Sequence, residues 1–334
     1  MKKKILVTGG AGYIGSHTVV ELINSGYKPI IIDNLCNSSS ENIKGIEKIV
    51  GEEVKWYNID CRNNQEMNNV FTKEGEIEGC IHFAAYKSVE ESVQDPEKYY
   101  NNNLSSLEVL LQCMYNHNTN NIIFSSSCTV YGMPDYLPVD ENAPFKKASS
   151  PYGETKQLCE KILQKSTCNS ISLRYFNPVG SHNSALIGDC STDKPSNLVP
   201  IITEVAIGKR EQIIVFGNNY NTSDGMCIRD YIHVVDLAKS HVQSIDFLLK
   251  NAGKHAFNVG SGKGVSVIEA ITTFEKANNV KINYSFGPRR SGDIEKIYAN
   301  GDLIKSQLGW ETKQTLKEAM KSAWKWEKKK SNKL

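Results

Sequence analysis

The sequence predicts an α/β fold in which a parallel sheet is covered on both faces by helices. Short apolar runs typical of strands alternate along the chain with amphipathic segments typical of helices, which is the pattern of βαβ units. The first such unit carries a glycine-rich turn between its strand and its helix. The length of 334 residues is sufficient for a large core and for two interlocked parts.

The expected elements follow one another regularly in the first half of the chain. Strands are predicted at residues 5–8, 29–32, 80–83, 122–124 and 170–175, and helices at 13–25, 99–115 and 153–164. Gly26 is suited to end the first helix. Because helical crossovers join parallel strands, both faces of this sheet should be covered, which predicts a doubly wound arrangement.

The composition changes after Asn177. Asn, Gly, Ser and Pro are frequent up to Ser196, and helix and strand patterns return after Leu198. We therefore predict two domains, a nucleotide-binding domain at 1–177 and a smaller C-terminal α/β substrate domain at 178–334. Segments at about 228–262 are expected to return to the first domain. The asparagine clusters at 101–103 and 116–121 are predicted to be helix ends or turns.

Composition and charge exclude several classes of protein. The formal net charge is +2, so bulk electrostatics predict no binding to nucleic acid or to a membrane surface. The lysine run at 328–330 is interpreted as a solvated helix end. The basic start of the chain is followed by only three apolar residues, too few for a signal peptide, and no segment approaches the ~20 apolar residues of a membrane span.

The cysteines indicate a reducing environment. There are nine, an odd number, and none forms a CxxC pair, so no metal site is expected. Free thiols are typical of the cytoplasm, which is the predicted location.

The glycine-rich turn predicts a Rossmann-type dinucleotide site. It follows a strand, opens a helix and precedes a second strand that ends at Asp33. Glycines at this spacing permit a tight turn, a close approach to a pyrophosphate and close helix–sheet packing. Asp33 would accept hydrogen bonds from a ribose diol, which favours NAD over NADP. The alternatives are a glycine turn without ligand and a Walker A loop, and the latter lacks its lysine. The residues assigned to the turn are Gly9, Gly12, Tyr13, Ile14 and Gly15.

Tyr152, Lys156 and Ser127 are the candidate catalytic residues. Tyr152 and Lys156 are four residues apart, so a helix places them on one face. A lysine ammonium beside a phenol lowers its pKa, and a tyrosine with a pKa near 7 could take a proton from a sugar hydroxyl. Ser127 follows an apolar strand, at the edge where open α/β sheets bind ligands. Two surface residues on a helix and a serine-rich strand end are the structural alternatives.

Taken together, these motifs resemble the extended short-chain dehydrogenase/reductase family and, within it, the UDP-galactose 4-epimerases. The resemblance runs from Lys4 to about Trp326. Besides the turn and the Tyr–Lys pair, it is carried by the segments 33–38, 82–85, 91–96, 174–180, 197–198, 229–234 and 288–293.

The resemblance implies interconversion of UDP-galactose and UDP-glucose with tightly bound NAD. The sugar is oxidised at C4, the 4-keto intermediate turns over while its UDP stays bound, and hydride returns to the opposite face. Tyr152 would abstract the 4-hydroxyl proton. Lys156 would lower the pKa of Tyr152 and hold the nicotinamide ribose. Ser127 would share the hydrogen bond to the sugar oxygen.

The resemblance also implies the binding residues. Lys87 would face the cofactor pyrophosphate, Arg229 and Arg290 the substrate diphosphate, and Asp293 the uridine ribose. The implied cofactor contacts beyond the glycine turn are Asp33, Asn34, Asn37, Ser38, Asp60, Cys61, Phe83, Ala84, Ala85, Lys87, Asn102, Tyr152, Lys156, Tyr175 and Phe176. The implied substrate contacts are Lys87, Ser127, Tyr152, Phe176, Asn177, Asn197, Leu198, Val215, Phe216, Arg229, Arg290, Asp293 and Ile297.

One departure concerns the sugar pocket. Ile297 stands where family members restricted to non-acetylated sugars carry a tyrosine, which leads to the hypothesis that UDP-N-acetylgalactosamine is also a substrate. The resemblance further points to a homodimer, formed through surplus apolar residues on the helices at 99–115 and from 152.

Three other functions compete with epimerisation. A 4,6-dehydratase would need acidic residues after Ser127, where this chain has Cys128–Thr129. Decarboxylating relatives are disfavoured less sharply. A non-catalytic dinucleotide sensor could share the fold but would not need Tyr152 or Lys156.

Overall fold

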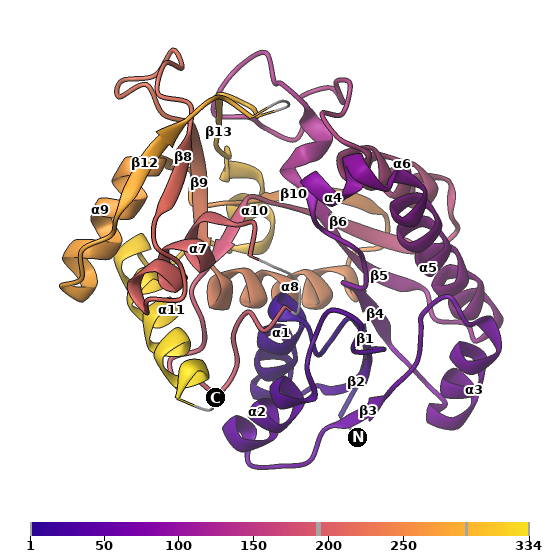
Figure 1. Ribbon diagram of the computed structural model, residues 1–334. Coiled ribbons are helices and arrows are strands. Elements are labelled where there is room, and N and C mark those ends of the chain that lie inside the picture. Colours follow the sequence, from indigo (N-terminus) through magenta and orange to yellow (C-terminus); the bar gives the residue numbers. More distant parts are fainter. Residues whose placement is uncertain (1, 192–194, 291–292, 333–334) are drawn as a thin grey trace.

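The computed structural model describes residues 2–191, 195–290 and 293–332. Its centre is a seven-stranded parallel sheet of order β10-β6-β5-β4-β1-β2-β3 (Figure 1). The strands are β1 (Lys4–Thr8), β2 (Lys28–Ile32), β3 (Lys55–Tyr57), β4 (Gly79–His82), β5 (Asn121–Ser127), β6 (Asn169–Tyr175) and β10 (Lys254–Val259). The predicted doubly wound α/β fold is confirmed.

Helices cover both faces of this sheet. One layer holds α1 (Tyr13–Asn24), α2 (Ser40–Val50) and α8 (Val234–Leu248), and the other holds α3 (Asn64–Glu74), α5 (Pro96–Asn116) and α6 (Pro151–Lys165) (Figure 1). The short helix α4 (Val89–Gln94) leads into α5. Successive side chains of a strand point to opposite faces. Accordingly, Ile5 and Val7 pack in the core beside α1 and α8, whereas Leu6 packs in the core beside α5.

The strand order reverses at β1, which pairs with β2 on one side and β4 on the other. The chain builds β2 and β3 outward in one direction, and β4, β5 and β6 in the other. In open α/β sheets a crevice forms outside the carboxyl ends of the strands at this reversal. The glycine turn after β1 and the serines at the end of β5 both lie at this edge.

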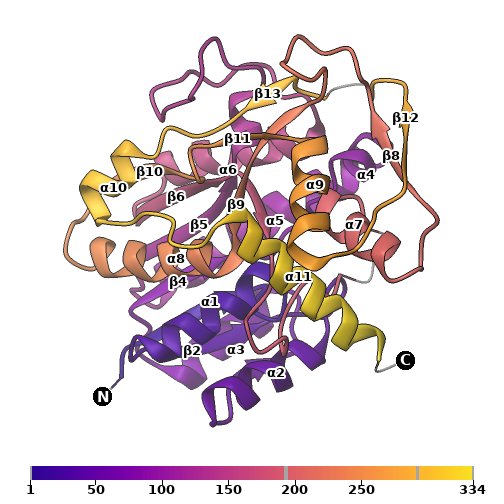
Figure 2. The same cartoon turned by 90° about the vertical axis from the view of Figure 1, so that its left-hand side faces the viewer.

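A second group of elements lies beside the large sheet (Figure 2). Strand β9 (Ile228–His233) pairs with β7 (Asn177–Val179), β11 (Gly264–Ser266) and β13 (Lys296–Ile297), and β8 (Ile213–Phe216) pairs with β12 (Tyr284–Gly287). Helices α7 (Leu198–Ala206), α9 (Val267–Asn278), α10 (Asp302–Leu308) and α11 (Leu316–Ser331) complete the chain. Residues of α7, α9 and α11 share a separate core with β8.

One predicted strand is longer than expected, and one local prediction was wrong. The strand expected at 122–124 continues through the serine run to Ser127, because each serine pairs with β6. The cluster 101–103 was expected at a helix end but lies inside α5, which begins earlier, at Pro96, with the Asp95 side chain as its cap. Asn103 keeps its amide satisfied there by bonding to the backbone of Tyr86.

None of the helices in the described part of the chain combines the length and apolar character needed to cross a membrane. Within the same residues, no group of three or more histidine, cysteine or acidic side chains is placed to hold a metal ion.

Candidate active site

The glycine turn after β1 is shaped by close backbone contacts. Gly9 has φ +69°, and a Cβ on it would lie 2.8 Å from the amide nitrogen of Ala84. A Cβ on Gly15 would lie 2.2 Å from the carbonyl oxygen of Gly9, so glycine there lets α1 pack against the turn. Gly12 precedes α1, and no side chain caps this helix end. Uncapped N–H groups at a helix N-terminus suit a pyrophosphate.

Asp33 is held beside this turn. One carboxylate oxygen accepts a hydrogen bond from the Ala11 amide at 3.0 Å, and the other accepts one from the Ser38 hydroxyl at 2.7 Å. The residue is only 7% exposed. These bonds fix the carboxylate at the end of β2, which is the arrangement required for gripping a ribose diol.

Asp60 and Cys61, two of the predicted cofactor contacts, differ in which of their groups a ligand can reach. Asp60 forms an ion pair with Arg62 at 2.6 Å, which lowers the pKa of the carboxyl group. The Asn34 amide also reaches Asp60, at 3.4 Å. The Cys61 side chain packs inside the apolar core, so only its backbone is available to a ligand.

Three predicted cofactor residues are tied to the segment 180–191. The Tyr13 hydroxyl donates to the Gly180 carbonyl at 2.6 Å, Asn37 accepts from the Ser191 hydroxyl at 2.6 Å, and Lys87 lies 3.8 Å from Asp189. Asn42 of α2 connects the same segment to the glycine turn by donating to the Ala11 and Gly188 carbonyls. The segment therefore runs along the predicted cofactor crevice.

The three candidate catalytic residues come together. Ser127 ends β5, and α6 begins at Pro151 with the Ser150 hydroxyl capping the Gly153 amide at 3.2 Å. This start places Tyr152 in the first turn, close enough to Ser127 for the serine hydroxyl to lower the pKa of the phenol. One turn later, the Lys156 ammonium donates to the Ser125 carbonyl at 2.7 Å and lies 5.8 Å from the centre of the Tyr152 ring.

The electrostatics of this trio differ from the sequence-based expectation. Burial raises the pKa of Tyr152 to about 12, and the nearby Ser127 hydroxyl only partly opposes this. Burial also lowers the pKa of Lys156 to about 8. The expected phenol pKa near 7 is absent because the ammonium points at the Ser125 carbonyl and does not offset desolvation. A further positive charge in this pocket would be required to lower it.

Aromatic residues stand at the carboxyl ends of β4 and β6. The Tyr175 hydroxyl is hydrogen-bonded to His241 of α8, and the Phe83 ring lies 4.8 Å from the same imidazole. Phe176 and Ile297 belong to one small apolar cluster, and Ile297 is only 2% exposed. Ile297, which the resemblance places beside the sugar pocket, is thus almost completely buried among apolar side chains.

The predicted diphosphate and uridine residues form a second cluster. Arg290 pairs with Asp293 at 3.1 Å, and Arg229 reaches the same carboxylate at 3.8 Å. The Arg290 guanidinium lies 4.9 Å from the centre of the Phe216 ring. Phe216 is 37% exposed, whereas the Val215 side chain is buried in the core, so only Phe216 offers a side chain to a base.

The remaining predicted substrate residues lie at element ends. Asn197 precedes Leu198, the first residue of α7, and its side chain makes no capping bond to the helix. Asn177 begins β7 and is half-buried. Asn102 donates to Asn103 at 3.0 Å. Ser291 and Gly292, within the resembling segment 288–293, lie outside the described residues.

Sequence reasoning missed several residues that support the site. Arg62 pairs with Asp60, His82 is hydrogen-bonded to Thr8 at 2.7 Å, and Asn103 binds both the Tyr86 backbone and Thr155. Glu160 and Arg174 form a buried ion pair. Only Glu160 carried a usable signal, because it follows Lys156 by four residues on the same helix face.

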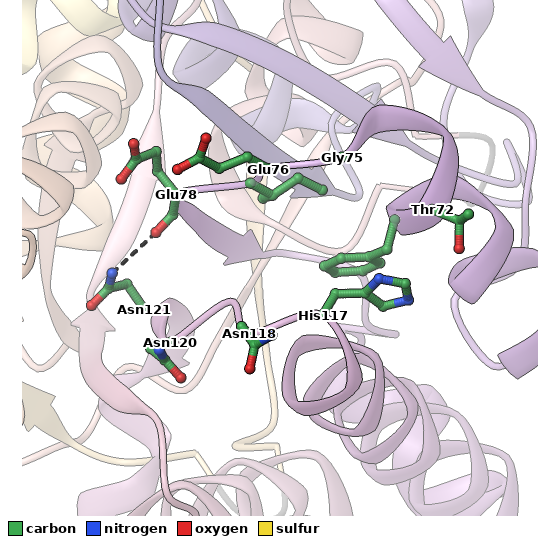
Figure 3. Close-up of a pocket in the computed structure, with 10 residues that line it drawn as sticks. Thr72, Gly75, Glu76, Glu78, His117, Asn118, Asn120 and Asn121 are labelled. Atoms are coloured by element: carbon green, nitrogen blue, oxygen red, sulfur yellow. Dashed lines mark hydrogen bonds between the residues drawn. The ribbon is translucent and has the colours of Figure 1, made fainter.

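A cavity of about 620 Å³ lies at the opposite, amino-terminal edge of the sheet (Figure 3). Its wall includes His117, stacked on Phe71 with a centroid distance of 5.3 Å. None of the residues that line it belongs to the predicted site. The candidate site therefore lies at the carboxyl edge, and this cavity is separate from it.

Comparisons with known proteins decide the family. Residues 6–323 match a family model described as GDP-mannose 4,6 dehydratase. The UDP-glucose 4-epimerase of Bacillus subtilis is 46% identical over 328 residues, which cover 97% of this chain and 96% of that protein. The corresponding enzyme of Dictyostelium discoideum is 46% identical over 97% of this chain and 95% of its own length. The chain belongs to the UDP-glucose 4-epimerase family.

Solved structures of this family share the fold. The UDP-glucose-4-epimerase of Stenotrophomonas maltophila, solved with NAD and formylated UDP-arabinopyranose, aligns with a TM-score of 0.96 at 40% identity, covering 99% of this chain and all of that one. The UDP-glucose 4-epimerase of Bifidobacterium longum, solved with NAD+ and UDP, aligns with a TM-score of 0.95 at 44% identity over the same shares. The resemblance noted from the sequence motifs is confirmed.

Proposed function

We propose that the chain interconverts UDP-galactose and UDP-glucose by NAD-dependent epimerisation at C4 of the sugar. The observation that carries this proposal is that Ser127, Tyr152 and Lys156 lie close together, at the strand edge that also holds the glycine turn. A phenol, a hydroxyl and an ammonium around one point form an acid–base group for a sugar alcohol.

The crevice fits NAD. A Cβ on Gly9 or Gly15 would collide with the backbone, so the glycines let the turn close tightly before the uncapped N-terminus of α1. The Asp33 carboxylate is oriented by three donors, the Ala11 and Leu35 amides and the Ser38 hydroxyl. Gly9, Gly12 and Gly15 would hold the pyrophosphate, and Asp33 the adenine ribose. NAD⁺, when bound, supplies a hydride acceptor for C4 and a positively charged ring.

The residues of the chain would handle the proton and hold the substrate. Tyr152, as phenolate, takes the proton of the 4-hydroxyl while Ser127 donates to the same oxygen. After the keto sugar has turned, Tyr152 returns the proton to that oxygen. Lys156 contributes positive charge to the pocket. Arg229 and Arg290 would pair with the diphosphate and keep UDP bound during this rotation.

A 4,6-dehydratase is the second candidate, because the matching family model carries that description. Dehydration needs an acid and a base near C5 and C6. The residues that follow Ser127 are Cys128 and Thr129, and burial raises the pKa of the Cys128 thiol to about 12. A neutral thiol and a hydroxyl are poor substitutes for a carboxylate pair, so epimerisation is favoured.

The experiment is proton NMR of UDP-galactose with the purified protein and no added NAD. Growth of UDP-glucose anomeric signals to a stable mixture is expected, and it would also show that NAD co-purifies. A 6-deoxy methyl signal would establish the dehydratase instead. No change even after NAD is added would remove the proposal.

Tyr152→Phe separates an enzyme from a dinucleotide sensor. Removing the hydroxyl should lower kcat by about 10²–10⁴-fold, the usual contribution of a positioned acid–base group. NAD content, measured by absorbance after denaturation, should equal that of the parent. Unchanged turnover would exclude Tyr152 as the acid–base residue.

We further propose that the protein works as a homodimer in the cytoplasm. None of the nine cysteines, all of which lie in the described part of the chain, forms a disulfide, which suits a reducing compartment. The half-buried leucines of α5 and α6, including Leu111 and Leu158, provide an apolar surface for a two-fold helix contact.

A further inference from the structure

A row of buried polar residues crosses three strands beneath the candidate active site. Ser126 of β5, Arg174 of β6 and Asn258 of β10 are direct neighbours in the sheet register. They are 1%, 6% and 0% exposed, respectively. Because neighbours in register point to the same face, all three side chains lie on the side covered by α6.

Arg174 and Glu160 are the charged centre of this row. The guanidinium of Arg174 donates to both carboxylate oxygens of Glu160, with a shortest distance of 2.8 Å. It also donates to the Tyr131 hydroxyl at 2.9 Å and lies 5.0 Å from the centre of the Phe145 ring. The Tyr131 hydroxyl in turn donates to Asn258 at 2.7 Å. The guanidinium of Arg174 is therefore held in place by hydrogen-bond acceptors and aromatic rings.

The carboxylate of Glu160 has one more partner, the Ser126 hydroxyl at 2.5 Å. Ser126 lies between Ser125 and Ser127, the two residues of β5 that are close to Lys156 and Tyr152 of α6. The carbonyl before it, on Ser125, accepts from Lys156, and the side chain after it, on Ser127, is close enough to Tyr152 to lower the pKa of the phenol. Glu160 follows Lys156 by one helical turn on α6. The end of β5 is thus joined to α6 by the hydrogen bonds of Lys156 and Glu160, and Glu160 makes the one that uses no catalytic side chain.

The chemistry of the pair indicates a positional role. Two buried charges are costly to desolvate, and apolar side chains of similar volume often hold a core equally well. A carboxylate fixed by a bidentate arginine offers something that apolar packing does not, which is an acceptor at a defined point and in a defined direction. Here that acceptor meets the hydroxyl adjacent to the reacting serine.

We propose that Glu160, held by Arg174, is a positioning residue for the epimerase reaction. Through Ser126 it sets the end of β5 against α6, so that the Ser127 and Tyr152 hydroxyls meet on the same sugar oxygen. The inference rests on the function proposed above for Ser127 and Tyr152. Small displacements of such groups are costly, since a misplacement of about 1 Å can reduce a rate about 10²-fold.

The test starts from Ser126→Ala, which removes the hydroxyl and leaves the ion pair in place. We expect kcat to fall roughly ten-fold or more, with KM for UDP-galactose within about two-fold and unchanged NAD content and thermal midpoint. The matched control is Ser170→Ala, a serine 2% exposed at the other end of the neighbouring strand, which should leave kcat unchanged.

A mutant cycle links this loss to Glu160. The double variant Glu160→Leu/Arg174→Met replaces both charges by apolar groups and should fold, with a kcat loss similar to that of Ser126→Ala. Adding Ser126→Ala to it should then cause no further loss, because the contact is already absent. Additive losses, a normal kcat in Ser126→Ala, or a fall in kcat matched by loss of NAD would overturn the inference. If Tyr152→Phe abolishes turnover while these variants do not affect it, the proposed function stands and only the positioning role fails.

Discussion

Lys156 is a buried cation whose burial has a measurable cost. Its pKa is lowered from 10.5 to about 8, mainly by desolvation. Between these two values the unfolded chain binds more protons than the folded one, so the stability contributed by this group rises with pH there. Below pH 8 the full penalty applies, and it amounts to about 3 kcal/mol.

Lys156→Met should therefore change stability in a pH-dependent way. Relative to the parent, the variant should gain more free energy of unfolding at pH 7 than at pH 10, where the penalty has fallen below about 1 kcal/mol. Urea unfolding at both values measures this difference. Lys161→Met, at an exposed position on the same helix, should show no such pH dependence. An equal effect of Lys156→Met at both pH values would show that the lysine is not desolvated.

Ile297 tests the hypothesis on N-acetylated substrates. Its side chain lies within the Phe176 cluster with 2% exposure, so a tyrosine at this position has to take space from its surroundings. Ile297→Tyr should reduce turnover of UDP-N-acetylgalactosamine about ten-fold or more relative to UDP-galactose, as is usual when a pocket loses space. Coupled NMR assays of both sugars provide the ratio. If the parent does not epimerise the acetylated sugar at all, the hypothesis is wrong.

At the residue scale, motifs with fixed spacing could be predicted and supporting contacts could not. The Tyr152–Lys156 spacing and the serine at a strand end have direct geometric consequences, and the structure brings these residues together. Arg174 reaches Glu160 only through the pairing of β5 with β6, which sequence spacing does not specify. The pKa of Tyr152 was likewise beyond sequence reasoning, because it depends on burial.

The connection between β1 and α1 is sensitive to a single added methyl group. A Cβ on Gly15 would lie 2.2 Å from a backbone oxygen, which has no rotamer to relieve the contact. Gly15→Ala should destabilise the fold by about 1–3 kcal/mol, as overpacked cores do, and the purified protein should carry less NAD. Thermal unfolding and cofactor absorbance measure the two effects.

Gly301→Ala is the matched control. A Cβ at this position meets nothing within 4 Å, so stability should change by less than about 0.5 kcal/mol. Equal stability and NAD content in the two variants would contradict the packing role of Gly15.

Five strands of the large sheet (β1, β2, β4, β5 and β6) and the helices α1, α5 and α6 were predicted from their periods, whereas β3, α2 and α3 were not. Their ends were less predictable. The serines of β5 are poor strand formers by composition, yet the register with β6 continues to Ser127. The asparagines of α5 are typical of helix ends, yet tertiary bonds of Asn103 keep them inside the helix. In both places long-range pairing outweighs local preference.

At the scale of the whole molecule, the proposed homodimer predicts a mass about twice the 37.3 kDa of one chain. Leu158→Glu puts a charge on the outer face of α6 and should shift the protein toward the monomer, because a buried unpaired charge is costly. Light scattering after gel filtration measures the mass. Leu303→Glu, at a leucine of α10 that is already 38% exposed, should leave it unchanged. A monomeric parent would exclude the dimer.

The topology of the second half was the least predictable part. Its sheets pair strands far apart in sequence, such as β8 with β12 and β9 with β13, and short strands give weak periodic patterns. The division at residue 178 remains our proposal. Strand β10 and helix α8 lie beyond that point and nevertheless pack with the large sheet.

The position of β10 has a consequence for synthesis of the chain. It covers the edge of β6, and its partner residues run from Lys254 to Val259. A ribosome must therefore release most of the chain before β6 gains its last neighbour. Until then β6 is an open edge, which is a template for pairing with other nascent chains. Translation that stalls between residues 178 and 253 should yield aggregation-prone fragments that depend on chaperones, even though their nucleotide-binding turn is already complete.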